Sequence, residues 1–114
     1  MGLPKKHHMN DDLRAKLDRA MERGDYEVLL DVYLDFNGTD PIRLFPEYSM
    51  DELHRYFEMG AREYAGGFVK SLSNTYWKGD THNRMKLRRT FARYFVKYVC
   101  FGRGVEKEKK RAEK

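Results

Sequence analysis

The segment 81–101 constrains the fold most strongly, because as a helix it would be apolar around more than half of its circumference. At about 100° per residue, its aromatic residues fall in one sector of the helical wheel, and its aliphatic residues widen that sector. A helix with so wide an apolar face is stable in water only when other elements cover it. The segment therefore predicts a mostly buried helix, with the rest of the chain packed around it.

Capping residues and apolar spacing predict three more helices. Asn10 is a favoured N-cap before apolar residues at helical spacing, and Gly24 ends that pattern. A second helix follows directly, and it is apolar over most of its circumference. Ser49 and Glu52 form a capping box that opens a longer third helix. The predicted helices span 10–23, 25–36, 49–77 and 81–101.

Proline and glycine shape the remaining segments. Residues 39–48 contain two prolines, which exclude a regular helix, but they are too apolar for a free linker. We therefore expect this connector to pack across the helices. The pair Gly66-Gly67 could interrupt the helix 49–77, although we expect one kinked helix there. Gly60 and Gly67 lie seven residues apart, and we expect both to permit close approach of another helix.

These patterns predict an all-α protein, built as a small irregular bundle of about four helices with a packed proline-containing connector and a charged C-terminal tail. We expect a flexible N-terminal segment over 1–9 and a single helical domain over 10–104. The charged tail over 105–114 is expected to be a solvated helical extension or a disordered end. Six large apolar residues are expected in the core: Leu53, Phe57, Phe68, Leu72, Phe91 and Phe95.

Charge is distributed unevenly along the chain. Residues 1–48 carry 7 basic and 10 acidic side chains, whereas residues 79–114 carry 12 basic and 4 acidic ones. Most basic residues of 81–101 occupy the one polar slot of that helix, so we expect them to form an exposed strip. Arg84 and Arg88 instead fall in the apolar sector, where a guanidinium needs an anionic neighbour. The candidate anion-binding or partner-binding residues are Arg84, Lys86, Arg88, Arg89, Arg93, Lys97 and Arg103.

An acidic row on the second predicted helix offers an alternative role for the basic strip. Glu27, Asp31 and Asp35 recur at i, i+4 and i+8 and so share one face. If the helices 25–36 and 81–101 pack antiparallel, the acidic row could lie beside the strip and pair with it internally. Otherwise the strip faces a partner. The sequence leaves both arrangements open.

No known catalytic motif occurs in the sequence. It contains no glycine-rich phosphate loop, no zinc-ligand spacing and no nucleophile elbow, so we expect a non-enzymatic protein without a cofactor. Asp51, His54 and Glu58 could share one helix face, but a di-metal site needs matching ligands elsewhere, and we interpret them as a polar surface cluster. The single cysteine, Cys100, is expected to be a small buried apolar side chain.

The function favoured by these observations is that of a non-catalytic accessory or structural subunit. Such a subunit would dock on a larger protein or ribonucleoprotein assembly through its basic C-terminal helix and tail. The alternative is a DNA-binding or RNA-binding regulator that uses the basic face of 81–101, because a helix, the turn KGDT and a helix follow the order of a helix-turn-helix. Without a secretion signal or a transmembrane segment, we expect an intracellular protein of unknown compartment, with peripheral membrane association left open.

Overall fold

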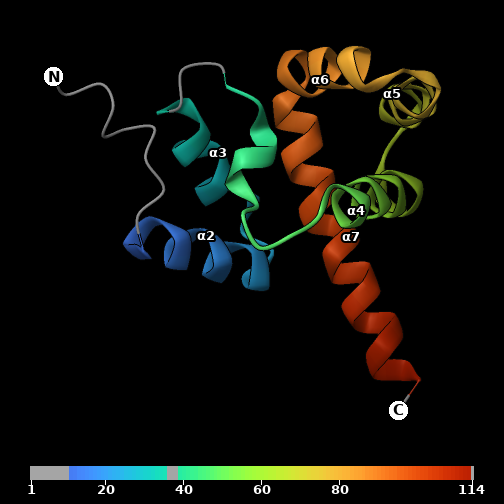
Figure 1. Ribbon diagram of the computed structural model, residues 1–114. Coiled ribbons are helices and arrows are strands. Elements are labelled where there is room, and N and C mark those ends of the chain that lie inside the picture. The colour runs from blue at the N-terminus through green and yellow to red at the C-terminus, as the bar shows by residue number, and fades with distance from the viewer. Residues whose placement is uncertain (1–10, 36–38, 114) are drawn as a thin grey trace, which may run out of the picture.

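The computed structural model describes residues 11–35 and 39–113, and every regular element within those ranges is helical (Figure 1). The predicted all-α class is confirmed, but the described residues form six α-helices rather than about four. The prediction of a flexible segment over 1–9 lies outside the described residues. The elements are α2 (Asp11–Arg23), α3 (Tyr26–Leu34), the 3-10 helix η1 (Pro41–Leu44), α4 (Met50–Tyr64), α5 (Gly67–Lys78), α6 (Thr81–Thr90) and α7 (Ala92–Ala112).

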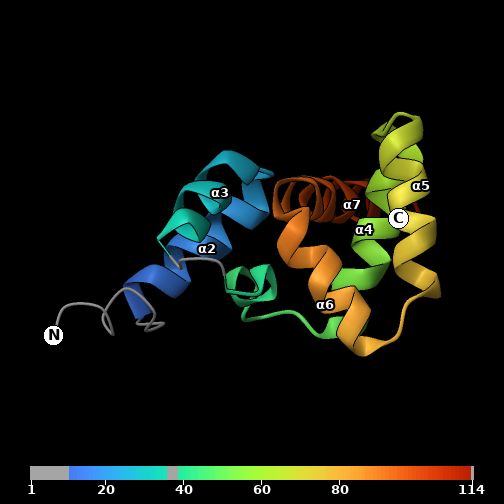
Figure 2. The ribbon, with the colours of Figure 1, turned by 90° about the horizontal axis from the view of Figure 1, so that it is seen from above.

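Helix α7 is the central element of the fold. In both ribbon views α2 and α3 lie on one side of it and α4 and α5 on the other, while α6 leads into its N-terminus (Figures 1 and 2). The proline-containing connector packs as predicted, because Pro41 and Leu44 of η1 are buried. The core runs through all these layers, and its fully buried side chains include Leu17, Leu29, Leu44, Leu53, Phe57, Tyr76, Phe95, Val96 and Val99.

The predicted helix 49–77 is in fact two helices. Its capping box is present, since Ser49 Oγ accepts from the backbone N–H of Glu52, and Glu52 accepts from that of Ser49. Helix α4 nevertheless ends at Tyr64, and Ala65 and Gly66 are extended before α5 begins. Two adjacent glycines disfavour a helix by about 1 kcal/mol each, which is enough to separate the two segments here.

The break changes which side chains of α5 are buried. Phe68 was expected in the core with Leu53 and Phe57, but it is 58% exposed, whereas the other two are buried. Once the backbone leaves the helix, the periodicity of α4 no longer decides which way α5 faces. Gly67 likewise makes no close helix contact, because a Cβ built on it would meet nothing within 4 Å.

The predicted helix 81–101 is also divided, and its second part runs further than expected. A single residue, Phe91, separates α6 from α7 with φ −114° and ψ 39°, and its side chain is half-buried rather than buried. Helix α7 then passes through Gly102 and Gly104 and continues to Ala112. From 105 to Ala112 the charged tail is therefore a helical extension of α7, which is one of the two forms expected for it.

Helices α4 and α7 cross at two glycines. A Cβ on Gly60 would fall far inside contact distance of the Tyr98 carbonyl oxygen, and one on Gly102 would lie 2.6 Å from Tyr56 Cα. Only hydrogen atoms fit between the two backbones at these positions. The predicted close approach at Gly60 is confirmed, whereas Gly102 was read as the end of the helix and not as part of a crossing.

Candidate functional site

Arg103, one of the predicted partner-binding residues, hydrogen-bonds to two side chains of its own chain. Its guanidinium donates to Tyr48 Oη at 3.3 Å and to Glu22 Oε1 at 3.0 Å. Lys107 reaches the second oxygen of Glu22 at 3.0 Å, so this one carboxylate of α2 holds two cations of α7. The hydrogen bond from Lys107 is the largest cause of the lowered pKa of Glu22. The C-terminal part of α7 is thus attached to α2.

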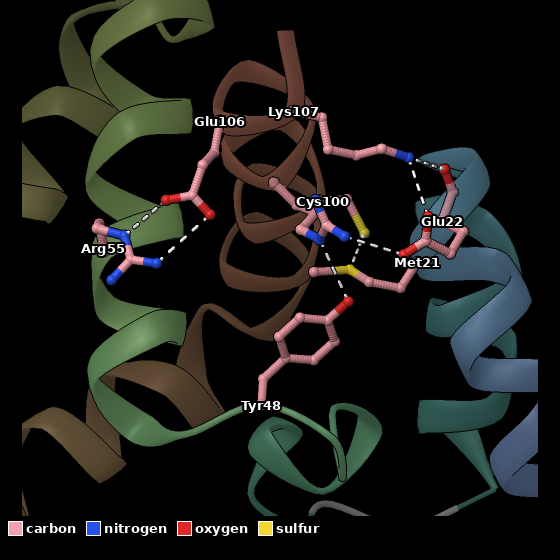
Figure 3. A network of polar contacts seen from close by, with 8 residues as sticks. Met21, Glu22, Tyr48, Arg55, Cys100, Glu106 and Lys107 are labelled. Atoms are coloured by element: carbon pink, nitrogen blue, oxygen red, sulfur yellow. Dashed lines mark hydrogen bonds and ion pairs between the residues drawn. The ribbon is translucent and has the colours of Figure 1, made fainter. Parts of the chain in front are cut away.

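The same part of α7 is attached to α4 on its other side. Arg55 donates to both carboxylate oxygens of Glu106, at 3.0 and 3.4 Å (Figure 3). Beneath these ion pairs, Cys100 is buried as predicted, with its sulfur 3.7 Å from Met21 Sδ, and burial raises the pKa of its thiol to about 12. Arg103, Glu106 and Lys107 of α7 therefore form ion pairs within the chain.

Arg88 has the counter-charge that its position on the wheel required. It is only 5% exposed, and its Nε and Nη2 donate to the two carboxylate oxygens of Asp40 at 2.9 and 2.7 Å. Its Nη1 donates to Tyr76 Oη at 2.8 Å. This geometry is that of a bidentate ion pair, one of the strongest side-chain interactions in proteins. It joins α6 to the connector before η1.

Tyr76 extends this contact to His54, which was expected on the surface but is buried. Tyr76 Oη and His54 Nε2 lie 2.7 Å apart, and the imidazole stacks edge-on against the Tyr76 ring. Because Arg88 already donates to the Tyr76 oxygen, the arrangement favours a neutral His54 whose unprotonated Nε2 accepts the phenol proton. Burial, with the positive charges of Arg84 and Arg88, lowers the pKa of His54 to about 4.

The buried imidazole should make the fold sensitive to acid. The folded-state pKa of His54 is about 4, below its ordinary value of 6.5, so the unfolded chain takes up the proton first. The contribution to stability is complete above pH 6.5 and is lost as the pH falls to about 4. The loss amounts to about 3 kcal/mol at about 1.4 kcal/mol per pH unit. Urea unfolding of the wild type and of His54→Gln between pH 7 and pH 4 measures it.

The difference in stability between the wild type and His54→Gln separates the effect of this histidine from that of the carboxylates, which take up protons at similar pH and are present in both proteins. His54→Gln keeps an acceptor for Tyr76 but cannot take up a proton, so its stability should fall less steeply between pH 6.5 and 4. His82→Gln, a change at an exposed position in the first turn of α6, is the matched control and should follow the wild type. Parallel curves for wild type and His54→Gln would contradict the prediction.

Arg84 finds carbonyl groups instead of the expected anion. Its guanidinium donates to the backbone oxygens of Tyr76 and Trp77, at 3.0 and 2.9 Å, and lies 5.2 Å from the Trp77 ring centroid. These oxygens belong to the last turn of α5, where the helix dipole carries partial negative charge. A cation is satisfied there without a carboxylate or phosphate, so Arg84 is a structural residue of the α5–α6 turn.

The remaining cations of the set lie toward the surface. Lys86, Arg89 and Arg93 are exposed, whereas Lys97 is partly buried over aromatic rings. Its Nζ is 5.4 Å from the ring centroid of Tyr26 and 5.8 Å from that of Phe101. The predicted strip is therefore exposed in its first half and covers an aromatic cluster in its second.

The acidic row lies beside the second half of this strip, across a groove between α3 and α7. The two helices are antiparallel, since Tyr26 at the start of α3 packs on Phe101 within α7, and Tyr33 near the end of α3 is close to Arg89, in the last turn of α6 just before α7 begins. The groove has a volume of about 340 Å³. We call it the α3/α7 groove; it is lined by Tyr26, Glu27, Leu30, Asp31, Leu34, Arg93 and Lys97.

The two charged walls of the groove do not pair with each other. Within the described ranges, no ion pair joins Glu27 or Asp31 to Arg93 or Lys97, and Glu27, Asp31 and Arg93 are exposed. The antiparallel arrangement considered from the sequence is thus present, but Glu27, Asp31 and Arg93 remain exposed, and Lys97 contacts aromatic rings. Asp35 is exposed too and does not line the groove.

Three large aromatic side chains are exposed next to α7, and sequence reasoning missed them. They form what we call the aromatic surface: Tyr64 (62% exposed), Phe68 (58%) and Tyr94 (36%). Tyr64 meets Phe101 with ring centroids 5.2 Å apart, and Phe68 meets Tyr94 at 5.6 Å. The sequence signal that could have located them is Gly66-Gly67, because a break there frees the start of α5 from the buried face of α4.

No family model, curated protein or solved structure matches this chain. In the described part of the chain, no cluster of three or more His, Cys, Asp or Glu side chains is arranged to hold a metal ion. Nor is any helix of those residues both long enough and apolar enough to cross a bilayer. The exposed aromatic rings and the groove lining define the candidate site: it consists of the aromatic surface and the α3/α7 groove, which are adjacent at Arg93 and Tyr94 in the first turn of α7.

Proposed function

We propose that the protein is a non-catalytic helical subunit that docks on a larger protein assembly through the aromatic surface and the adjoining exposed cations of α6 and α7. The observation that carries this proposal is that Tyr64, Phe68 and Tyr94 are exposed together along α7. Trp77 is the other exposed aromatic side chain among the described residues, and it lies at the end of α5 against His54 and Arg84. Aromatic residues with neighbouring arginine are the typical energetic centres of protein interfaces. We do not include Arg103 and Lys107 in this docking surface, because both already form ion pairs with Glu22.

A nucleic-acid regulator is the second candidate, and one observation favours it. Phe68 and Tyr94 are exposed and in contact with each other, and Tyr94 directly follows the exposed Arg93 in α7, whereas the helical wheel predicted that the rings would point away from the cations. Exposed rings beside phosphate-binding cations are the elements of single-strand binding. Binding through several cations would weaken steeply with added salt, and docking through aromatic rings would not.

Site-specific cross-linking tests the docking proposal. A photo-reactive benzoylphenylalanine in place of Phe68 should cross-link one constant protein in native extract of the source cells. The same probe at Met50 should not, because Met50 is also exposed but begins α4, about 20 Å along the helix axis from Tyr64 at about 1.5 Å per residue. Cross-links from position 68 to nucleic acid would favour the second candidate. Equal labelling from both positions would contradict the proposal.

Substitution at the same position separates docking from folding. Phe68→Asp should weaken binding of the cross-linked protein by about tenfold or more, because removal of an interface aromatic typically costs 2 kcal/mol or more. It should change the free energy of unfolding by less than about 1 kcal/mol, since the ring is mostly exposed. Affinity measured by biolayer interferometry and urea unfolding give the two values. Unchanged affinity would show that Phe68 lies outside the interface.

A further inference from the structure

The α3/α7 groove has opposite charges on its two sides and an apolar floor. Glu27 and Asp31 stand one helical turn apart on α3, and Arg93 and Lys97 stand one turn apart on α7. Between them, Leu30 is partly buried, and at one end Leu34 is 75% exposed. Among the described residues, Leu34 does not pack against the apolar core, and no ion pair joins the two charged walls. We therefore consider a ligand that would cover Leu34 and meet both walls.

We propose that this groove binds an amphipathic helix from a partner protein. The helix carries basic side chains along one edge of its apolar ridge and acidic side chains along the other. The inference rests on the proposed docking function and names the partner segment that the groove would hold. Basic side chains would face Glu27 and Asp31, acidic ones would face Arg93 and Lys97, and the ridge would cover Leu30 and Leu34. Reversing a helix exchanges its two edges, so the walls also fix the direction of the bound helix.

A helix fits this groove better than an extended chain. The groove lies between two helices, whose backbone N–H and C=O groups are already used within α3 and α7. An extended peptide would find no sheet edge there and would leave its own backbone groups unpaired as it displaced water. A helix satisfies its backbone internally and offers only side chains. Its charges at i and i+4 repeat every turn, which matches the spacing of both walls.

The same walls disfavour nucleic acid in this groove. A nucleic-acid strand whose phosphates contacted Arg93 and Lys97 would also lie close to Glu27 and Asp31, because all four side chains line the same groove. Like charges brought together at an interface cost affinity and suppress the wrong partner. A ligand with both signs of charge matches both walls at once, whereas a polyanion matches one and is repelled by the other.

Binding of designed peptides tests the inference on the whole chain. Three fluorescent helical peptides of about 14 residues, roughly four turns, share a leucine ridge. The mixed-edge peptide carries lysine along one edge of the ridge and glutamate along the other. The lysine-edged peptide carries lysine along both edges, and the glutamate-edged peptide carries glutamate along both. Fluorescence anisotropy should show the mixed-edge peptide binding about fivefold to thirtyfold more tightly than either single-sign peptide. In each single-sign peptide, two exposed charge pairs that would attract become repulsive. An oligothymidylate of similar length should bind more weakly than the mixed-edge peptide.

Charge reversal on one wall should switch this preference. Glu27→Lys with Asp31→Lys makes both walls basic, so the glutamate-edged peptide should become the tightest ligand. Arg93→Glu changes the other wall and should shift the preference toward the lysine-edged peptide. The matched control is Asp11→Lys with Glu113→Lys, which changes net charge equally at two exposed positions outside the groove and should leave the order unchanged. Circular dichroism checks that each variant is folded.

Other outcomes overturn the inference. Equal affinity for all three peptides would show that their leucine ridge binds and that the charged walls of the groove do not affect the affinity. Tightest binding of the glutamate-edged peptide or the oligothymidylate to the wild type would show a purely cationic site. Either result would leave the docking function intact if the probe at Phe68 still captured one protein. Conversely, the probe at Phe68 could capture no protein while the three peptides still bound in the predicted order. That result would refute docking through the aromatic surface and would leave the inference about the groove intact.

Discussion

Gly102→Ala should destabilise the protein by about 3 kcal/mol or more, at or above the upper end of the range typical of overpacking. The added methyl group would lie far inside contact distance of the Tyr56 carbonyl group, with Tyr56 Cα at 2.6 Å. These atoms are backbone, so no side-chain rotation can relieve the overlap, and α4 and α7 must move apart. Urea unfolding followed by circular dichroism at 222 nm measures the loss. A change of less than 1 kcal/mol would contradict the proposed crossing.

Gly104→Ala is the matched control, because it lies in the same helix but meets open space. It should stabilise the protein by about 0.5–1 kcal/mol, since alanine favours a helix more than glycine does. Gly60→Ala should be costly for the same reason as Gly102→Ala. The double variant of Gly60 and Gly102 should lose less than the sum of the single losses, because one separation of the helices relieves both overlaps. Additive losses would show that the two contacts are independent.

Arg88→Met should cost about 3–5 kcal/mol, because it breaks a buried ion pair from one side. Asp40 would keep a largely buried carboxylate without its cation, and Tyr76 Oη would lose its donor. Methionine retains much of the volume, so the loss reports on charge and hydrogen bonding more than on a cavity. Thermal and urea unfolding at pH 7 measure the effect.

Two comparisons make this prediction specific. Arg14→Met removes an ion pair of similar length, 3.0 Å to Glu47, but both side chains are nearly half exposed, and the loss should stay below about 1 kcal/mol. Adding Asp40→Asn to Arg88→Met removes the orphaned charge and should recover part of the stability. Because Arg88 also lowers the pKa of His54, Arg88→Met should reduce the acid sensitivity as well. A loss equal to that of Arg14→Met would contradict the buried role of Arg88.

Several local features of this protein could be predicted from its sequence. The helical class and the capping box at Ser49 follow from interactions between residues a few positions apart, which act in any tertiary setting. The need for a counter-charge at Arg88 also follows from one helix alone, since the wheel places a guanidinium in an apolar sector. The approximate positions of α2 and α3 were correct for the same reason.

The tertiary structure decided how those pieces meet. That Asp40 is the carboxylate that meets Arg88, and that the acidic row lies beside the basic strip without pairing, depends on packing between residues far apart in the chain. The exposure of Phe68 depends on how α5 turns after the break, and the continuation of α7 through Gly102 depends on the crossing with α4. Propensity and periodicity act within a helix, whereas each of these outcomes is set by the contacts of one helix with another.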